Sequence, residues 1–598
     1  MNQMSAMHTR QTRFLLEDTG GIGYVFDSPS SYWEARSADQ ISKALFQIEE
    51  ACQQGRHVIG LFPYELGLAF QDLSSRHLSD MVLLRAWAFP QLQILSSRDI
   101  EDFLKEATSN EPPSGFVSLQ PQMDITTYSQ VVNQIHQAIR QGETYQLNFT
   151  FPWKGSFYGS PLSLYRRLRN RQPGPYSAYL EWESEFVLSH SPESFIEHRS
   201  GMLTCRPMKG TADRERGSAL SQDPKNQSEN VMIVDLIRND LSRIALPDSV
   251  EVSDLFKVHA YGEVAQMTST ITARLRPEQP LESILRAMFP CGSVTGAPKR
   301  RTMEWIDRLE EHSRGLYCGS IGWFKPCEKN TVPDFHLNVA IRTLEINPEC
   351  QVTLGVGSGI TIESEAGREW SECHLKASFA TELPSSVGLI ETMRYDRGQI
   401  KLEIAHLRRL EGSAQALGIP FKSQQIKKDL EGYLKNLDSA QSFRIRLELH
   451  PSGEFEIHSE TLTPLEGPVD LMWASALGYP CMSSKNPLLG HKTTDRQIYD
   501  QATQQAVQHG AFDALFINEH GLVTEGGRSN LFVRLGQQWK TPPLTDGVLP
   551  GIQRELTIKE SAPRVQEISL TIQDVLKADE IWITNSLRGK LIVKGFRS

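Results

Sequence analysis

The sequence predicts an α+β protein, with α/β layers, that has two domains. Helical and strand-like runs alternate irregularly, which is typical of α+β arrangements and not of a parallel Rossmann sheet. Residues 382–386, Glu-Leu-Pro-Ser-Ser, separate two periodic segments, and proline beside paired serines is typical of a linker. We therefore expect a first domain over residues 1–381 and a second over residues 387–598, each long enough to bury its own core.

Apolar spacing predicts three helices in the first domain. One ends before Gly142 and has Thr126 or Thr127 as its N-cap. Its apolar positions are Tyr128, Val131, Val132, Ile135 and Ile139. The other two helices are expected over residues 229–240, with an acidic start, and over about residues 365–379.

The second domain mixes both kinds of element. Residues 387–394 are strand-like, and residues 404–417 form a helical pattern that Gly418 ends. Residues 443–449 alternate between apolar and polar side chains, and a turn at residues 451–453 leads into another strand.

Composition excludes several classes of protein. The chain has 62 basic and 72 acidic residues, a net charge of −10, and no long lysine or arginine run, so we expect no nucleic-acid partner. No apolar stretch is long enough to span a bilayer, and the first residues lack the apolar core of a signal peptide, so we expect a cytoplasmic protein without membrane contact. The eight cysteines contain no C-x-x-C, which favours reduced thiols.

Four stretches of the first domain carry candidate chemistry. They are residues 191–211, 229–240, 290–299 and 342–372. Taken one at a time, a lysine or glutamate is usually a solvated charge, and a Gly-x-Gly-x-Gly run is usually a tight turn. In this combination and order they resemble the chorismate-utilising enzymes over about residues 120–380. The resemblance implies a layered α/β sandwich that binds chorismate beside a Mg²⁺ ion.

The resemblance also implies a role for each matching residue. Glu229 and Glu372 match the metal-binding glutamates, whose oxygens suit Mg²⁺. Lys209, in Pro-Met-Lys-Gly-Thr, matches the nucleophilic lysine of the aminodeoxychorismate synthases, and Glu193 matches their general acid. The chorismate contacts match Gly210, Thr211, Gln266, Tyr317, Arg342, Gly357, Ser358 and Gly359. Gln266 stands where relatives often have histidine, and glutamine carries no proton-transferring charge.

The second domain resembles the fold-type IV pyridoxal-phosphate enzymes over nearly its whole length. The matching segments are residues 388–394, 406–410, 490–492, 523–530, 549–554 and 583–586. The resemblance implies that Lys492 links pyridoxal 5'-phosphate and moves protons, and that Glu525 lies beside the pyridine nitrogen. The implied phosphate contacts are Arg409, Ile552, Gln553, Asn585 and Ser586. Enzymes of this family commonly form homodimers, so we expect one through this domain.

Together the two resemblances imply a bifunctional enzyme of 4-aminobenzoate formation, on the route to folate. Chorismate would be aminated to 4-amino-4-deoxychorismate, and pyruvate would then be eliminated. We find no Gly-x-Cys-x-Gly turn of a glutaminase, so ammonia is expected from a separate glutamine amidotransferase subunit. Motifs alone do not separate a lyase from an aminotransferase in the second domain.

Two other functions remain open on the sequence. One is an anthranilate-synthase-like domain fused to a true aminotransferase, against which Lys209 counts, because anthranilate synthases have alanine there. The other is a non-catalytic chorismate sensor, which the retained Lys209, Glu193, Glu229 and Glu372 oppose.

Overall fold

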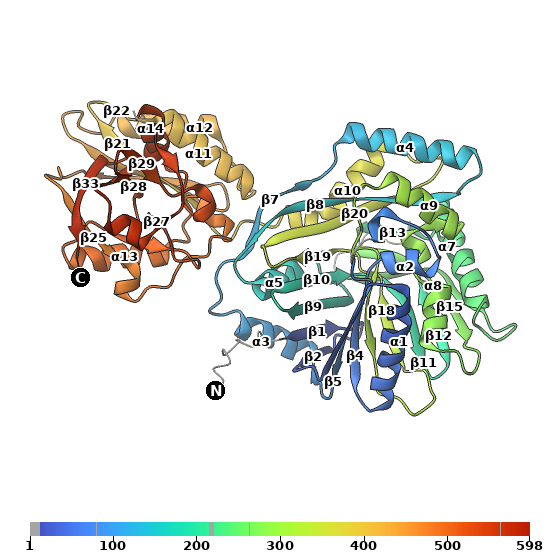
Figure 1. The fold of residues 1–598 in the computed structure, drawn as a ribbon. Helices are drawn as coiled ribbons and strands as arrows, with labels where there is room; N and C mark the ends of the chain where they lie inside the picture. The colour runs from blue at the N-terminus through green and yellow to red at the C-terminus, as the bar shows by residue number, and fades with distance from the viewer. Residues whose placement is uncertain (1–11, 79–80, 214–219, 262–263, 562–563, 598) are drawn as a thin grey trace, which may run out of the picture. The chain divides into compact units, whose positions relative to one another are not determined.

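The computed structural model describes residues 12–78, 81–213, 220–261, 264–561 and 564–597. The chain divides into two compact units, and the last boundary along the chain falls between Thr381 and Glu382 (Figure 1). The first unit runs up to Glu111 and continues over Gln120–Gly155 and Ser160–Thr381. The second unit contains Glu382–Ser598 together with two short segments from the earlier part of the chain, Pro112–Leu119 and Ser156–Gly159.

The first unit is built on two 10-stranded sheets. The first sheet has the order β16 (Gly296–Ala297), β8 (Gln146–Tyr158), β20 (Gln351–Ile360), β19 (Thr343–Ile346), β10 (Glu185–Ser191), β9 (Tyr176–Trp182), β1 (Arg13–Glu17), β2 (Gly23–Asp27) and β6 (Gln93–Leu95), and β7 (Gly115–Pro121) pairs with β8. The second has the order β13 (Met208–Asp213), β15 (Val264–Arg274), β12 (Met202–Arg206), β11 (Ser194–Arg199), β18 (Phe335–Asn338), β17 (Ser320–Phe324), β4 (His57–Phe62), β5 (Leu84–Phe89) and β3 (Ser31–Ala35), and β14 (Glu251–Tyr261) pairs with β15.

The two sheets of the first unit share one apolar core. Phe14 and Leu180 from the first sheet pack with Ile59 and Phe89 from the second, and all four side chains are fully buried. The ring centroids of Phe14 and Phe89 are 5.5 Å apart in an edge-to-face arrangement. This packing is that of a layered sandwich, as the sequence predicts.

Helices cover the outer faces of these sheets (Figure 1). They are α1 (Ala38–Gln53), α2 (Glu65–Phe70), α3 (Ser97–Ala107), α4 (Ile125–Arg140), α5 (Pro161–Arg171), α7 (Pro224–Ser242), α8 (Leu281–Met288), α9 (Lys299–Leu309) and α10 (Ala366–Thr381). The three predicted helices are found as α4, α7 and α10. The predicted N-cap of α4 is wrong: Asp124 caps this helix, because its carboxylate accepts a 2.7 Å bond from the Thr127 amide.

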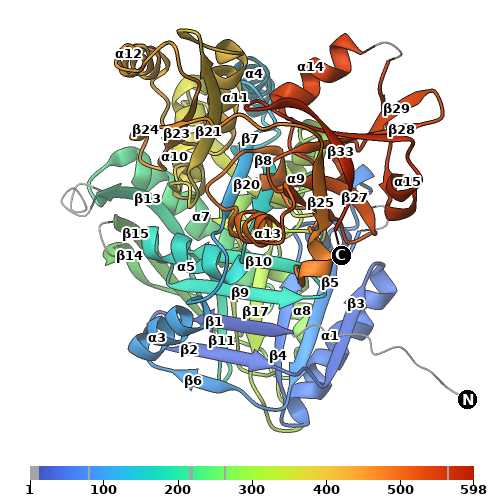
Figure 2. The ribbon, with the colours of Figure 1, turned by 90° about the vertical axis from the view of Figure 1, so that its left-hand side faces the viewer.

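The second unit contains two further sheets, and Figure 2 shows α11 and α12 beside the smaller one. The smaller sheet has the order β22 (Gln399–Ile400), β21 (Leu389–Asp396), β23 (Phe443–Leu449) and β24 (Phe455–Thr461). The larger has the order β30 (Gln566–Glu567), β29 (Gln538–Thr541), β28 (Asn530–Leu535), β32 (Glu580–Asn585), β33 (Gly589–Phe596), β25 (Val469–Trp473), β26 (Asp513–Ile517), β27 (Leu522–Gly526) and β31 (Leu570–Thr571). The helices are α11 (Glu403–Ala416), α12 (Ser423–Leu434), α13 (Gln497–Gln508), α14 (Ile552–Glu560) and α15 (Ile572–Leu576).

The core of the smaller sheet includes two residues from the early segments. Val117 and Tyr158 are 7% and 2% exposed and belong to the same apolar cluster as Leu389 and Ile445. The Tyr158 hydroxyl also lies 3.2 Å from the Ser386 hydroxyl. The second unit therefore buries apolar groups that precede its main segment by more than two hundred residues, which the sequence analysis did not anticipate.

We expect Tyr158→Ala to destabilise the second unit by about 3–5 kcal/mol, the usual cost of truncating a buried aromatic side chain. Hydrogen–deuterium exchange of the full chain should then accelerate in β21 and β23. Tyr145→Ala, at a tyrosine that is 66% exposed, serves as the control and should leave exchange unchanged. Unaltered exchange of β21 in Tyr158→Ala would show that this contact does not stabilise the unit.

All eight cysteines are free thiols. In the described part of the chain, no helix is long and apolar enough to cross a membrane. The predicted absence of a signal peptide concerns the first sixteen residues, of which the first eleven lie outside the described ranges.

Candidate active sites

The first candidate site contains a buried acid beside an amine. Glu193 lies between β10 and β11, is 4% exposed, and its Oε1 atom has no hydrogen-bond partner in the described structure. Burial raises the pKa of this carboxyl group, although a hydrogen bond from Ser293 and the charge of Lys209 act in the opposite direction. Lys209 is half-buried on β13, opposite Met267 of β15. The pair can therefore supply a proton donor and a nucleophile at one place.

In the first unit, Arg342 is a candidate binding residue for a substrate carboxylate. It precedes β19 with a backbone φ of +52°, and burial lowers the pKa of its guanidinium to about 10. None of the described acidic residues forms an ion pair with it. A partly buried guanidinium without an acidic partner is suited to bind a substrate carboxylate through two parallel hydrogen bonds.

Tyr317 and the glycines of β20 are held by close packing. A Cβ atom on Gly355 would lie 2.2 Å from the Tyr317 ring. On Gly357 it would lie 2.5 Å from the Phe149 carbonyl oxygen, and on Gly359 it would lie 2.4 Å from Nε2 of Gln146. Gly357 and Gly359 thus allow β20 to approach β8, and Gly355 allows the Tyr317 ring to pack on β20, a structural reason that the sequence alone did not reveal.

Ser358, Gly210, Thr211 and Gln266 complete the predicted substrate contacts. The Ser358 hydroxyl lies 2.9 Å from the Tyr128 hydroxyl, so it is tied to α4. Gly210 has a φ of +78° at a register shift between β13 and β15, a conformation that favours glycine. Thr211 and Gln266 pair across these strands, and their side chains lie outside the described part of the structure.

The two predicted metal ligands come from different helices, Glu229 from α7 and Glu372 from α10. The Glu372 carboxylate is half-exposed and forms a 2.7 Å ion pair with Lys376, whose Nζ also donates a 2.9 Å bond to the Gly357 carbonyl. Carboxylate oxygens are the donors that Mg²⁺ prefers, so this pair fits the ion chemically. The described residues form no cluster of three or more potential metal ligands.

The second candidate site contains a lysine with a depressed pKa. Lys492 precedes α13, and its carbonyl accepts a 2.8 Å bond from the Ile390 amide at the start of β21. Burial, with the nearby charges of Arg496 and Arg409, lowers the pKa of the amine to about 7. A large fraction of this amine is therefore neutral near pH 7, as a nucleophilic or basic lysine requires.

Glu525, on β27, is 7% exposed and accepts three hydrogen bonds. The donors are the Tyr499 hydroxyl at 3.2 Å, the Asn530 amide at 3.0 Å and the Leu549 backbone N–H at 3.0 Å. Burial nevertheless raises the pKa of the carboxyl group to about 7. Tyr499 and Asn530 were not among the predicted site residues: Asn530 lies in a matching segment, whereas no pattern in the sequence indicates Tyr499.

Arg409 is oriented by an acid that the sequence analysis did not select. Its Nε and Nη2 atoms donate to Glu391 at 2.8 and 2.7 Å, and its Nη1 donates to the Pro550 carbonyl at 3.3 Å. His406 Nδ1 lies 2.6 Å from the same carboxylate. Burial alone would raise the pKa of Glu391, but Arg409 and His406 lower it to about 2, so Glu391 stays ionised and holds the guanidinium in place.

The start of α14 provides backbone donors near Arg409. Gly551 is its N-cap, and the next two residues, Ile552 and Gln553, have the free N–H groups of a helix start. A Cβ on Gly551 would lie 1.9 Å from Oδ1 of Asn530, so only glycine fits. The Arg409 guanidinium and the N–H groups at the start of α14 fit the phosphate of pyridoxal phosphate, and the neutral amine of Lys492 fits its aldehyde.

Asn585 is the last residue of β32, and Ser586 begins the turn that follows it. The Asn585 side chain accepts a 2.9 Å bond from the Arg588 amide and donates a 3.2 Å bond to the Arg528 carbonyl. It therefore stabilises this turn and joins it to the loop that follows Glu525. Direct phosphate contact by Asn585 and Ser586 remains a prediction.

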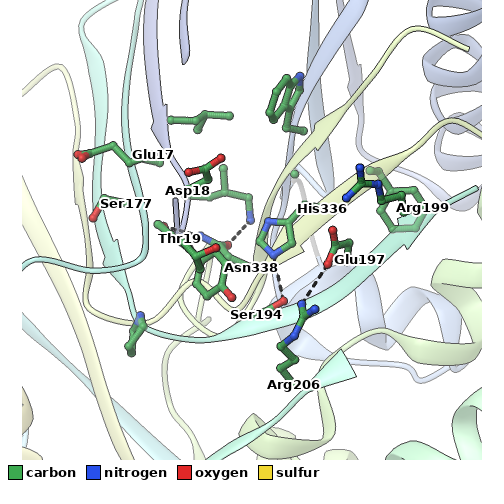
Figure 3. Close-up of a pocket in the computed structure, with 18 of the residues that line it drawn as sticks. Glu17, Asp18, Thr19, Ser177, Ser194, Glu197, Arg199, Arg206, His336 and Asn338 are labelled. Carbon is green, nitrogen blue, oxygen red and sulfur yellow. Dashed lines mark hydrogen bonds and ion pairs between the residues drawn. The ribbon is translucent and has the colours of Figure 1, made fainter. Parts of the chain in front are cut away.

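The first unit also contains a cavity of about 740 Å³ that the motifs did not indicate (Figure 3). Pro192 and Ser194, which flank Glu193, line it, but none of the predicted site residues in the described structure does. In its wall, Ser194 lies 3.0 Å from His336 and Arg206 forms a 3.0 Å ion pair with Glu197.

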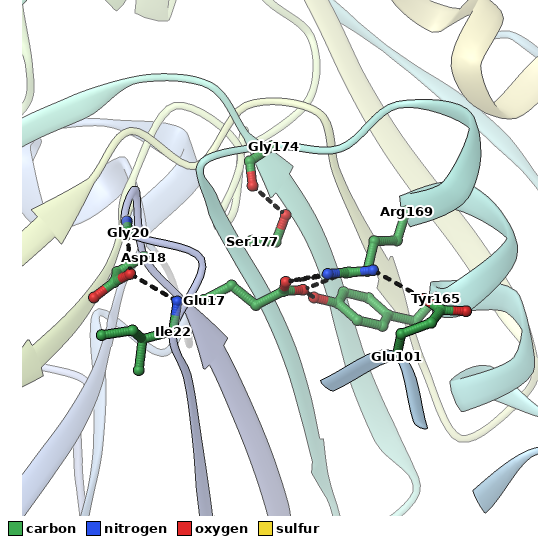
Figure 4. A network of polar contacts seen from close by, with 9 residues as sticks. All are labelled: Glu17, Asp18, Gly20, Ile22, Glu101, Tyr165, Arg169, Gly174 and Ser177. Atoms are coloured by element: carbon green, nitrogen blue, oxygen red, sulfur yellow. Dashed lines mark hydrogen bonds and ion pairs between the residues drawn. The ribbon is translucent and has the colours of Figure 1, made fainter. Parts of the chain in front are cut away.

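A polar network connects the rim of this cavity to α5 (Figure 4). Glu17 forms a 2.8 Å ion pair with Arg169 and accepts a 2.7 Å bond from the Tyr165 hydroxyl. Asp18 accepts bonds from the Gly20 and Ile22 amides at 2.8 and 3.0 Å, which fixes the turn after β1. Glu17 comes from β1 and its partners Tyr165 and Arg169 come from α5, 148 and 152 positions later, so no short spacing in the sequence indicates these contacts.

Known proteins resemble each unit separately. Aminodeoxychorismate synthase component 1 of Salmonella typhimurium is 34% identical over 339 residues, which are 52% of this chain and 73% of that protein. The protein of the same name from Escherichia coli is 33% identical over 340 residues and is covered to 74%. A solved structure named for an isochorismate synthase of Bacillus anthracis covers 63% of this chain and 97% of its own, with a TM-score of 0.50 at 17% identity, which shows the fold alone.

For the second unit, a solved structure named for a 4-amino-4-deoxychorismate lyase of Legionella pneumophila is 31% identical. It covers 35% of this chain and 83% of its own, with a TM-score of 0.30. The family model of chorismate binding enzymes matches residues 16–382, and that of class IV amino-transferases matches residues 388–596. The chain therefore belongs to the chorismate binding enzyme family and carries a class IV amino-transferase domain behind that region.

Proposed function

We propose that the chain converts chorismate into 4-aminobenzoate in two steps, with 4-amino-4-deoxychorismate as the intermediate. The observation that carries the proposal is the presence, in one chain, of two lysines that each lie near a buried acid. Lys209 lies beside Glu193 in the first unit, and Lys492 lies near Glu525 in the second. The names of the relatives of the two units, a synthase component and a lyase, support this order of reactions.

In the first step, Arg342 binds a carboxylate of chorismate and orients the ring. The Lys209 amine attacks the ring, the bond from carbon to the hydroxyl oxygen breaks, and Glu193 donates the proton with which the hydroxyl leaves as water. Ammonia then displaces Lys209 and gives the aminated product. Mg²⁺ held by Glu229 and Glu372 would stabilise the negative charge of the substrate. A separate glutamine amidotransferase subunit would supply the ammonia.

In the second step, Lys492 removes the proton from the ring carbon that bears the new amine. The chemistry that pyridoxal phosphate supplies when bound is withdrawal of electrons from that carbon. The bond from the neighbouring carbon to the ether oxygen then breaks, pyruvate leaves, and the ring becomes aromatic. Arg409, Ile552 and Gln553 would hold the phosphate, and Glu525 would hold a proton at the pyridine nitrogen.

The direct test supplies the purified protein with chorismate, Mg²⁺, ammonium and pyridoxal phosphate and identifies every product. We expect 4-aminobenzoate and pyruvate in equal amounts, without any 2-oxo acid acceptor. Formation of anthranilate, or amine transfer to a 2-oxo acid without release of pyruvate, would instead support an anthranilate-synthase-like domain fused to an aminotransferase.

We further expect Glu372→Gln and Glu229→Gln to weaken Mg²⁺ binding, because each substitution removes a ligand charge and nearly preserves the shape. Formation of 4-amino-4-deoxychorismate should require a higher Mg²⁺ concentration or cease. Pyruvate release from supplied intermediate should continue at the wild-type rate. Glu365→Gln, an acid at the start of the helix that carries Glu372, is the matched control. An unchanged Mg²⁺ requirement in both variants would remove these residues from the metal site.

A further inference from the structure

Four arginines gather in the second unit, and we term them the arginine cluster: Arg394, Arg444, Arg528 and Arg588. Arg394 of β21 stands directly opposite Arg444 of β23 in the strand register. Its Nη1 atom lies 3.5 Å from the carbonyl oxygen of Leu587, the residue before Arg588. Burial lowers the pKa of the Arg588 guanidinium, and the charges of Arg394 and Arg528 lower it further. Burial also lowers the pKa of Arg528, and the charge of Arg444 acts in the same direction. The four charges are therefore close enough to repel one another.

This arrangement is electrostatically unfavourable for folding. Residues that face each other across an antiparallel pair lie on the same side of the sheet, and like charges at such positions are destabilising. The opposite side carries Met393 and Ile445, which are fully buried in the core. Arg588 forms no ion pair with any acidic residue in the described ranges.

Nearby acids neutralise the cluster only in part. Arg394 Nη2 lies 3.5 Å from Asp396, a long contact, and Arg444 pairs at 3.1 Å with Glu460, which is 68% exposed. Exposed pairs of this kind contribute little because solvent screens them. The charge of buried Asp513, on β26, raises the pKa of Arg528, but its carboxylate also accepts bonds from the Ala514 and Arg528 amides and the Ser529 hydroxyl. The cluster therefore retains positive charge that a bound anion would balance.

The cluster is connected to the Lys492 site through two hydrogen bonds to backbone carbonyl groups. The strand that carries Arg394, β21, has its first residues beside Lys492, whose carbonyl accepts a 2.8 Å bond from the Ile390 amide. Ile390 and Arg394 lie on the same face of the strand, about 13 Å apart at the usual rise of a β-strand. Arg496, four residues after Lys492, donates a 2.6 Å bond to the carbonyl of Gly527, which precedes Arg528.

We propose that the arginine cluster binds the ring carboxylate of the substrate in the second reaction. This inference rests on the proposed function, in which the substrate is 4-amino-4-deoxychorismate. Its ring carboxylate lies opposite the amine, so a molecule whose amine is at Lys492 extends its carboxylate away from the lysine. Guanidinium groups match a carboxylate with two parallel hydrogen bonds, and a shared anion relieves their mutual repulsion.

The test measures pyruvate release from supplied 4-amino-4-deoxychorismate by Arg444→Gln and Arg588→Gln. Loss of a charged hydrogen bond should raise KM about tenfold or more, with a smaller change in kcat. Arg444→Lys keeps the charge and should recover part of the affinity. Arg534→Gln is the matched control, because Arg534 lies in the same unit and pairs with Glu580 at 3.4 Å. It should leave KM unchanged.

A second measurement distinguishes the loss of carboxylate binding from a general loss of folded, cofactor-bound protein. In the wild type, 4-aminobenzoate should inhibit the second reaction far better than aniline, which lacks the carboxylate, and the two arginine variants should lose this difference. Variants are compared at equal visible absorbance of the bound cofactor, which identifies folded protein. Wild-type KM and retained discrimination in both variants would overturn the assignment while the lyase function stands. Absence of pyruvate from the wild-type reaction would overturn the proposed function and this inference with it.

Discussion

Lys492→Ala is expected to abolish pyruvate release from 4-amino-4-deoxychorismate and to leave its formation from chorismate intact. Burial and two neighbouring guanidinium groups lower the pKa of Lys492 to about 7, so the wild-type enzyme has a neutral amine as base. Removal of a positioned base costs about 10²–10⁴-fold in rate, and the cofactor also loses its point of attachment. Pyruvate is measured by reduction with lactate dehydrogenase, and the accumulating intermediate is measured by chromatography.

The same variant has a readout that does not depend on turnover. A cofactor linked to lysine absorbs in the visible, and this absorbance should disappear in Lys492→Ala but remain in Lys427→Ala, at an exposed lysine of α12. Only a neutral amine reacts with an aldehyde, so reloading of cofactor-free wild type should accelerate as the pH rises through about 7. Pyruvate release at the wild-type rate by Lys492→Ala would exclude this lysine as the base.

Lys209→Ala is expected to stop the formation of 4-amino-4-deoxychorismate while the second reaction continues on supplied intermediate. The lysine would form the bond to the ring, and Glu193, whose pKa burial raises, would supply the proton to the leaving hydroxyl. Glu193→Gln cannot donate that proton and should slow the same step by about 10²–10⁴-fold. Both effects are measured as product formed from chorismate and ammonium.

Intact-mass spectrometry tests the covalent step directly. In a Lys492→Ala background, chorismate without ammonium should add the mass of the substrate less water to the protein. The adduct should be absent after the further substitution Lys209→Ala and present after Lys154→Ala, at an exposed lysine of β8. An equally abundant adduct in the Lys209→Ala protein would show that another group is the nucleophile.

Elements with a strong local pattern were predictable from the sequence. The helix expected over residues 404–417 is α11, Glu403–Ala416, followed by Gly418 with a φ of +66°. The alternating segment 443–449 is β23. The N-cap of α4 was predicted wrongly because Asp124, Thr126 and Thr127 can all cap a helix. The path of the chain before α4 decides which of these three residues lies at the N-cap position, just before the first helical residue.

By itself, the sequence determined the order of the motifs, and the resemblance of these short segments to two known families implied the candidate residues Lys209, Glu193, Lys492 and Glu525. The tertiary structure alone decided which groups surround them. Glu391 of β21 binds Arg409 of α11, and the Tyr158 hydroxyl contacts the hydroxyl of Ser386, 228 positions later in the chain. Spacing along the chain encodes periodicity and turns, whereas contacts between distant segments depend on strand order and register, which no short pattern specifies.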